Sequence, residues 1–525
     1  MATSNNIPDV FYWIQNLKPI SQWQSDSMSL TISSSSSTSS SSSSTSSSSS
    51  LPLLKLILPK NHNNNNNKLS FAIIADFNNI HIPLWNSKPF KPNNNNNKPE
   101  DSNKNLLLLD QETISSLFNN FIQAILHYGS NKNSPFIRFP KLDYIPNFSD
   151  IFNVSFFTLS FLVCIYEAPA DLRSGSIQTL KGYLTSTQQS QASNSLMKLL
   201  GSNLEEQWMR SLNLGITTWI GEMQETISPV QEKMMRTPCS LFSHGFSTFG
   251  LWKVQLYCPV IAMDIESSKS HLPNEKLQFS LKYHQLEGVL QFNYKVSIKD
   301  TWVEIMANID NIRCDVVKLV NNSLLRERGA GPTEKHFPSR ISLQLTPTLQ
   351  TQVLSVSVGK SSENPRREIG TDKSIEASFD PPSNPLGLKV SAGESTTVSL
   401  KPWKFEESIY GYSANLNWFL HDSMDGKEVY SSKPSKFALI NPKSWFKNRY
   451  SSAYRPFTRQ GGVIFAGDEY GDKVLWKVDK DAIGKTMEWE IRGWIWLTYW
   501  PNKHKTFYNE TRRFEFGEIV HLHVA

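Results

Sequence analysis

The sequence has few cysteines and no paired metal-binding motif. Its four cysteines are Cys164, Cys239, Cys258 and Cys314, and no two of them form a Cys-x-x-Cys pair. Finger-type zinc sites need closely spaced thiolates, so a structural zinc site of that kind is excluded. Scattered free thiols are typical of a reducing compartment.

The sequence also lacks a hydrophobic run long enough to cross a membrane. The best candidate, residues 151–166, contains Asn153, two serines and a threonine, and it falls short of the roughly 20 apolar residues that a spanning helix needs. The first residues show neither the basic start nor the apolar core of a signal peptide. We interpret residues 151–166 as a buried segment and expect a soluble intracellular protein, cytoplasmic or nuclear.

Motifs for chemistry are missing as well. There is no Gly-x-Ser-x-Gly elbow, and the glycines at 461–462 and 467–471 fit neither a phosphate loop nor a dinucleotide fingerprint. Ser243 and His244 are adjacent, which points their side chains apart. His521 and His523 would share one face of a strand, but no third metal ligand accompanies them. We predict no catalytic residues, no metal and no cofactor.

The sequence has only a small excess of charge of one sign. The chain carries 53 basic and 47 acidic residues, which gives a net charge of +6 over 525 residues. So small an excess supplies no strong field for a polyanion, and it disfavours a nucleic-acid partner.

What the sequence does contain is low-complexity tracts placed beside short apolar segments. Serine fills residues 33–50 apart from two threonines, and asparagine fills 63–67 and 93–97. Apolar segments at 28–32, 53–58, 69–75 and 80–84 flank these tracts, and residues 10–14 form an aromatic-rich start. Lengthening a turn from about four to about eighteen residues costs only ~1.3 kcal/mol. We therefore predict that residues 1–105 form a β-meander with expanded turns. A phosphorylation segment or a condensate-forming segment is the alternative interpretation of the tracts.

Residues 106–225 have helical spacing. Asp110 is a candidate N-cap, and apolar residues from Ile114 to Ile125 recur at i, i+3 and i+4. Further helices are predicted within 150–167, from Pro169 to about 184, at 196–200 and at 204–223. Pro and Gly punctuate residues 226–250, which we interpret as a connector.

From residue 251 to 525 the sequence predicts strand after strand. Short alternating segments separated by Gly, Pro and Asn are typical of an antiparallel sandwich, either one large or two smaller. The predicted fold class is therefore α+β and multi-domain: a β-meander, a helical block, and a large antiparallel β-sandwich region. The predicted strands are 251–260, 277–283, 289–298, 302–309, 341–345, 353–358, 387–390, 396–400, 412–420, 462–466, 474–478, 488–500, 513–516 and 519–524, and 326–338 is predicted to be a connecting loop.

The strongest strand pattern lies at residues 489–500. One face is apolar throughout, whereas the other begins with Glu490 and Arg492 and continues with Trp494, Trp496 and Trp500. This strand is expected to run from a solvated surface into a place that is covered on both sides.

One segment interleaves basic and aromatic residues without any acid. Cations that meet phosphates, together with rings that stack or lie at a headgroup layer, would suit docking. The alternative is a structural loop whose aromatic rings pack inward on the sandwich while its Lys and Arg side chains reach solvent. The candidate binding residues are Lys443, Trp445, Phe446, Lys447, Arg449, Tyr450, Tyr454, Arg455, Phe457 and Arg459.

These observations leave three functions open. The first is a non-catalytic interaction or scaffold protein that docks a macromolecular partner, expected to be a protein, through the β region. The second is peripheral binding to anionic lipid through residues 443–459. The third is a carbohydrate-binding or carbohydrate-active sandwich, which requires the indole of Trp494, Trp496 or Trp500 to be exposed in a groove beside a carboxylate.

The two ends of the chain carry a family resemblance. Residues 7–17, Ile-Pro-Asp-Val-Phe-Tyr-Trp-Ile-Gln-Asn-Leu, residues 493–501, Gly-Trp-Ile-Trp-Leu-Thr-Tyr-Trp-Pro, and the style of the homopolymer tracts resemble a plant-specific β-rich protein family without an assigned activity. The resemblance implies a plant, intracellular setting and transfers no ligand or site residue.

Overall fold

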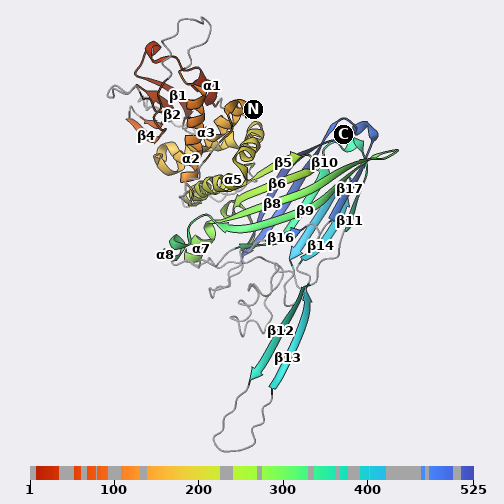
Figure 1. Cartoon of the computed structure of the whole chain (residues 1–525). Coiled ribbons are helices and arrows are strands. Elements are labelled where there is room, and N and C mark those ends of the chain that lie inside the picture. The colour runs from red at the N-terminus through yellow and green to blue at the C-terminus, as the bar shows by residue number, and fades with distance from the viewer. Residues whose placement is uncertain are drawn as a thin grey trace, which may run out of the picture. The chain divides into compact units, whose positions relative to one another are not determined.

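The chain forms two compact units. Unit 1 holds Met1–His244, Tyr257–Ala262 and Lys318–Leu324, and unit 2 holds Gly245–Leu256, Met263–Val317 and Leu325–Ala525 (Figure 1). The computed structural model describes residues 7–34, 52–60, 68–77, 80–92, 108–130, 137, 139–224, 240–268, 275–328, 336–360, 367–376, 391–400, 403–420, 463–466, 472–499 and 510–524.

Unit 1 begins with the predicted meander. Its four strands pair in chain order, each antiparallel to the next. Ser34 is the register partner of Leu53, so the chain that carries the serine tract connects two hydrogen-bonded strands. The asparagine tracts lie outside the described residues. The strands are β1 Ser27–Ser34, β2 Leu53–Pro59, β3 Ala72–Phe77 and β4 Ile80–Asn86.

The aromatic-rich start is a helix, α1 Val10–Gln15, and not part of the β region. Asp9 caps this helix by accepting a hydrogen bond from the Tyr12 N–H at 2.9 Å. The Phe11 N–H donates to Asn153 Oδ1 at 3.0 Å, and the Phe11 ring packs on Phe152. Capping and tertiary packing therefore override the strand propensity of a valine- and aromatic-rich segment.

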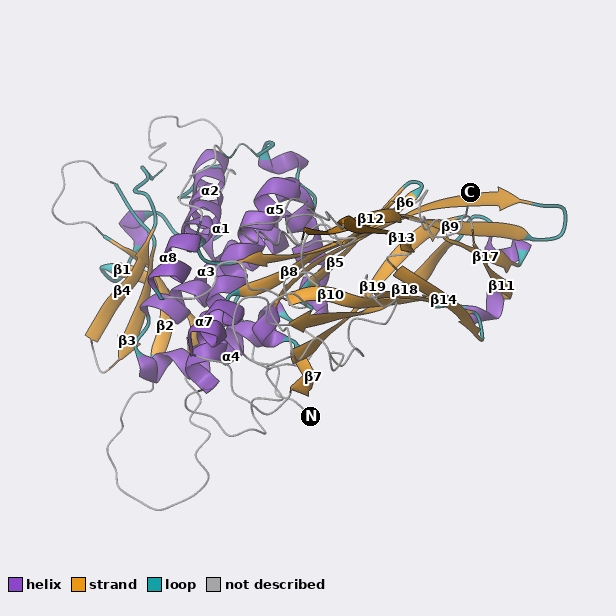
Figure 2. Cartoon of the chain, turned by 90° about the horizontal axis from the view of Figure 1, so that it is seen from below, coloured by secondary structure: helices purple, strands orange, loops and turns teal. Residues whose placement is uncertain are grey.

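The predicted helical block is confirmed, and Figure 2 shows its helices beside the meander. Asp110 is the N-cap of the first helix and accepts from the Thr113 N–H at 2.8 Å. The longest helix has a non-helical break at Gly201, where φ is +72°, a conformation that glycine adopts without strain. The helices are α2 Gln111–His127, α3 Phe148–Glu167, α4 Ala170–Leu184 and α5 Thr187–Gln224.

Helix α3 is the apolar segment noted in the sequence. Within the described residues it is the one helix with the length and composition to cross a membrane, and 89% of its most apolar window is buried in the fold. It packs among helices α1, α2, α4 and α5 and strand β4. This environment is that of a core helix, as predicted.

Unit 2 is built from antiparallel sheets. A seven-stranded sheet has the order β11-β17-β9-β8-β6-β5, with β16 also paired to β9, and a six-stranded sheet has the order β14-β15-β10-β18-β19-β7. Strands β12 and β13 pair separately. The strands are β5 Ser243–Thr248, β6 Leu251–Pro259, β7 Asp264–Ser268, β8 His284–Ile298, β9 Val303–Lys318, β10 His336–Pro347, β11 Val353–Lys360, β12 Arg367–Glu376, β13 Ser391–Leu400, β14 Trp403–Tyr410, β15 Ser413–Leu420, β16 Val463–Ala466, β17 Asp472–Val478, β18 Thr486–Tyr499 and β19 Glu510–His523.

Tryptophans join the two large sheets. The Trp489 ring on β18 lies 5.3 Å from that of Trp252 on β6 and 5.8 Å from that of Trp476 on β17. All three side chains are fully buried. The predicted sandwich core therefore lies between these sheets.

Three predictions in the β region need correction. Residues 277–283 form helix α7 Glu275–Lys282, because Leu277 and Leu281 lie one helical turn apart and pack with Tyr499. The predicted loop at 326–338 instead contains the end of helix α8 Asn322–Glu327 and the start of β10. The two final strands are one continuous strand, β19. The predicted strand at 387–390 lies outside the described residues.

Candidate functional site

The basic-aromatic segment cannot be placed. All ten of its candidate binding residues, from Lys443 to Arg459, lie outside the described residues. Their role in docking remains a prediction.

A second candidate site does emerge on the face of the six-stranded sheet that points away from the core. The Arg340 guanidinium on β10 lies 4.7 Å from the Phe419 ring on β15 and 4.3 Å from the Trp496 ring on β18. The register places Arg340 directly opposite both residues. A guanidinium held between two rings is fixed by cation–π attraction and by contact with the ring faces.

The row continues across the next two strands. Trp496 Nε1–H donates to Glu266 Oε2 on β7 at 2.5 Å. Arg513, the register partner of Trp496 on β19, pairs with Glu266 Oε1 at 3.0 Å. We call Phe419, Arg340, Trp496, Arg513 and Glu266 the outer row. It crosses five neighbouring strands of the sheet.

Two further groups flank the outer row. Arg492 Nη2 pairs with Glu515 Oε1 at 2.6 Å, and its guanidinium lies 5.5 Å from the Trp494 ring. Both Trp494 and Trp496 are half-buried and lie on the face opposite the core tryptophan Trp489. Cross-strand pairing of Arg492 therefore gives this part of the face a fixed geometry.

Burial along β18 follows the sequence prediction. On the outward face Arg492 is exposed, Trp494 and Trp496 are half-buried, and Thr498 is buried. The strand thus runs from solvent into a covered environment, as expected. Trp500 lies outside the described residues.

The electrostatics of this face are balanced. Arg492 pairs with Glu515, and Arg513 pairs with Glu266 and lies 4.0 Å from Asp264, whereas the Arg340 guanidinium contacts two aromatic rings. These three arginines are equalled in number by three carboxylates, and a face without excess charge exerts little long-range attraction on a polyanion. It instead offers planar hydrogen-bonding groups between aromatic rings.

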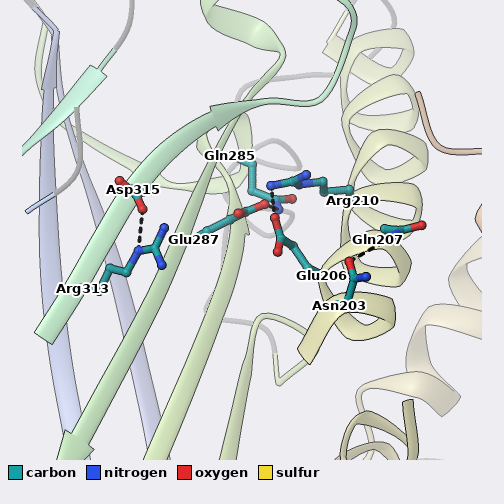
Figure 3. Close-up of polar contacts among 8 residues, drawn as sticks. All are labelled: Asn203, Glu206, Gln207, Arg210, Gln285, Glu287, Arg313 and Asp315. Carbon is teal, nitrogen blue, oxygen red and sulfur yellow. Dashed lines mark hydrogen bonds and ion pairs between the residues drawn. The ribbon is translucent and has the colours of Figure 1, made fainter. Parts of the chain in front are cut away.

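The remaining polar clusters are local. Figure 3 shows Glu206 with Arg210 and Asn203 with Gln207 on helix α5, and Arg313 with Asp315 along strand β9. Pairs of this kind within one element contribute about 0.5 kcal/mol or less. They stabilise their own helix or strand and do not mark a site.

Other candidates for chemistry are structural. His244 is buried, and its Nδ1 lies 3.2 Å from Asn194 Oδ1. Burial raises the pKa of the Cys164 thiol to about 12, so this group stays protonated. His521 contacts Glu488 at 3.5 Å, and among the described residues no cluster of three metal ligands exists.

His244 makes the stability of unit 1 sensitive to pH. Burial lowers the pKa of His244 from 6.5 to about 4. Between these two pH values the histidine is protonated in the unfolded chain and neutral in the folded protein. The stabilisation is complete above pH 6.5 and is lost as pH falls toward 4. We expect a loss of about 2 kcal/mol between pH 7.5 and pH 5. Denaturant titrations followed at 222 nm, where the helices dominate the signal, measure this loss.

The matched variants for that measurement are His244→Gln and His127→Gln. The first removes the buried imidazole and should flatten the pH dependence of the stability. The second removes an exposed imidazole of unit 1 and should leave that pH dependence unchanged. If the wild type and both variants show the same pH dependence of stability, His244 is not its source.

Sequence reasoning found the tryptophans but missed their partners. Arg340, Phe419 and Glu266 come from three segments that are far apart in the chain, and no local pattern links them. In the sequence, the second half of β18 is apolar on both faces. This pattern was the only indication that other residues pack against the outward face of the strand.

Comparison with known proteins adds no family. No family model matches, and no curated protein matches. Among solved structures, the chain is similar to the Clostridium perfringens NetB toxin in the membrane inserted form, with 8% identity over 51% of this chain and 94% of that one and a TM-score of 0.21. It is similar to Clostridium perfringens delta-toxin, with 11% identity over 53% and 95% of the two chains and a TM-score of 0.21. It is also similar to a pore forming protein, with 9% identity over 53% and 88% of the two chains and a TM-score of 0.16.

Proposed function

We propose that the protein is a non-catalytic binding protein whose outer row docks an extended neutral glycan. The observation that carries this proposal is the half-buried indole of Trp496, which lies on the outward face beside the Glu266 carboxylate and the Arg340 guanidinium.

The chemistry of the row favours a glycan. Sugar rings present apolar C–H faces that pack on aromatic rings, and their hydroxyl groups pair with carboxylates and guanidinium groups. Here both kinds of group stand in one line. Because strands lie about 4.8 Å apart, a row across five strands extends for about 19 Å, which suits a chain of several sugars better than a monosaccharide.

The charge balance separates this function from the anionic alternatives. An anionic membrane or a nucleic acid needs an excess of cations, whereas Arg492 and Arg513 are paired with Glu515 and Glu266, and the Arg340 guanidinium lies against the rings of Phe419 and Trp496. The membrane hypothesis rests on residues 443–459 alone. The glycan proposal and the membrane hypothesis therefore predict that different substitutions weaken binding.

The first test uses neutral hexasaccharides. Cellohexaose, xylohexaose and mannohexaose are titrated into the full chain, and binding is followed by calorimetry. The Trp496→Ala variant should bind at least about tenfold more weakly, since losing one stacked ring and its hydrogen bond removes about 1.4 kcal/mol. Glucose, xylose and mannose should bind much more weakly than the hexasaccharides.

The matched control is Trp302→Ala. Trp302 is also half-buried and also carries a cation, Lys477, 4.5 Å from its ring, but it lies outside the outer row. Its removal should leave binding unchanged. Absence of binding to every neutral hexasaccharide would overturn the proposal. So would binding only to phosphatidylserine vesicles, at a strength unaffected by Trp496→Ala, which would favour residues 443–459.

A further inference from the structure

A buried charged cluster lies at one end of the sandwich, apart from the outer row. His336 is the first residue of β10, and its Nε2 lies 3.1 Å from Glu510 Oε1 on β19. Arg512, two residues further along β19, binds the same carboxylate, with Nη2 3.2 Å from Oε2. The side chains of His336 and Glu510 are 1% and 6% exposed. His336 and Glu510 are therefore buried, and Arg512, whose side chain is 14% exposed, lies at the edge of the cluster.

A second histidine meets this cluster from the opposite sheet. His284, the first residue of β8, is fully buried, and its ring lies 5.9 Å from the His336 ring, edge to face. Because β8 and β10 belong to different sheets, this contact connects the two layers of the sandwich. Among the described residues, the Tyr499 ring on β18 also lies near His336, at 5.7 Å, and Tyr499 packs in turn with Leu277 and Leu281 of helix α7.

The hydrogen bonds of the cluster indicate the protonation states of Glu510 and His336. Burial raises the pKa of Glu510, but Arg512 and the bond from His336 outweigh it and hold that pKa well below its usual range. Glu510 is therefore ionised and accepts, so His336 Nε2 carries a proton. Among the described residues, His336 Nδ1 has no hydrogen-bond partner. A second proton on His336 would have to enter at this nitrogen.

Protonation would upset the charge balance of the site. Among the described contacts of His336, ionised Glu510 and charged Arg512 have opposite charges that cancel around a neutral His336. A proton on Nδ1 would add a positive charge to this buried site, next to the ring of His284 and near Arg512. Adding a net charge to a low-dielectric interior is strongly unfavourable.

We propose that His336, bonded to Glu510 and packed against His284 of the opposite sheet, forms an acid-sensitive latch, which holds the two sheets together at neutral pH and releases this end of the sandwich when His336 takes up a second proton.

The pH window follows from the same groups. Burial lowers the pKa of His336 below 6.5, so the unfolded form binds more protons than the folded one as the solution is acidified. The contribution of the latch is complete above pH 6.5 and declines as pH falls below it. The contribution of Glu510, whose pKa is lowered from 4.5, is lost only at still lower pH. Acidification to pH 5 therefore tests His336 and leaves the Glu510 carboxylate ionised.

The test is hydrogen exchange of the full chain, read by mass spectrometry at pH 7.5 and pH 5.0 with exchange times corrected for intrinsic rates. Peptides that cover the first residues of β8, β10 and β19 should lose protection at least tenfold at pH 5.0. Peptides around Trp489, in the middle of the sandwich, should keep theirs. The wild-type comparison needs no variant, and uniform loss across the sandwich, or no loss, would overturn the proposal.

Two variants assign the effect to the latch. In His336→Gln a neutral amide can still donate to Glu510 at both pH values, so protection should no longer depend on pH. The matched control is His523→Gln, an exposed histidine on the same strand β19, which should behave as the wild type does. Full pH dependence retained in His336→Gln would overturn the latch. Should this variant not fold at pH 7.5, the wild-type exchange pattern decides.

Discussion

Replacing Trp489 by alanine is expected to lower the free energy of unfolding of unit 2 by about 3–5 kcal/mol. This indole is fully buried and touches the rings of Trp252 and Trp476 on the opposite sheet. Its removal leaves a cavity lined by flat rings on strands that are held in place by hydrogen bonds. Such a site cannot collapse to fill the space, which places the cost at the high end of the range for large-to-small substitutions.

The measurement is urea unfolding followed by near-ultraviolet circular dichroism, which reports the packing of the aromatic core. A second variant, Trp489→Phe, should cost less, because the indole N–H has no hydrogen-bond partner among the described residues and its loss leaves no acceptor stranded. Trp302→Ala, at the half-buried site used above as a control, should cost about 1 kcal/mol or less. Equal losses for Trp489→Ala and Trp302→Ala would refute the assignment of Trp489 as the centre of the core.

Replacing Gly493 by alanine is expected to be destabilising by about 1–3 kcal/mol through overpacking. An added Cβ would lie 2.2 Å from Phe516 Cζ and 3.0 Å from Leu343 Cδ2. The Phe516 ring comes from the register partner on β19 and occupies the space that the glycine leaves empty. The smaller backbone entropy of alanine in the unfolded chain favours the variant by under ~1 kcal/mol, so the steric term wins.

Gly517 provides the matched control in the neighbouring strand. A Cβ added at Gly517 would meet no atom closer than Glu490 Oε1 at 3.5 Å, so Gly517→Ala should be neutral or slightly stabilising. The double variant Gly493→Ala with Phe516→Leu removes the ring that clashes and should recover part of the stability. If both single alanine variants unfold at the same urea concentration, the ring is not what requires a glycine at position 493.

Part of the architecture was predictable because its causes are local. The Asp110 cap, the i, i+4 spacing of α2 and the strict alternation of β18 each arise from residues within a few positions of one another. The serine tract was placed correctly between two strands because the flanking apolar segments were evident. The buried α3 followed from its length and its interspersed polar residues.

Errors arose where a distant contact outweighed a local preference. Residues 10–14 have the composition of a strand, but the Asp9 cap and packing on α3 make them a helix. Residues 277–283 were expected in a strand, but Leu277 and Leu281 find their partner in Tyr499 more than 200 positions away. Propensity is a weak guide where burial decides the outcome.

The sequence alone determined the kinds of element present, their approximate limits and the placement of tryptophans on both faces of β18. Only the tertiary structure decided which strands lie side by side, and therefore that Phe419, Arg340 and Glu266 meet Trp496, and that His284 meets His336 across two sheets. The physical reason is that pairing between strands far apart in the chain depends on the complementarity of whole faces, a property of the packed body that no short stretch of sequence contains.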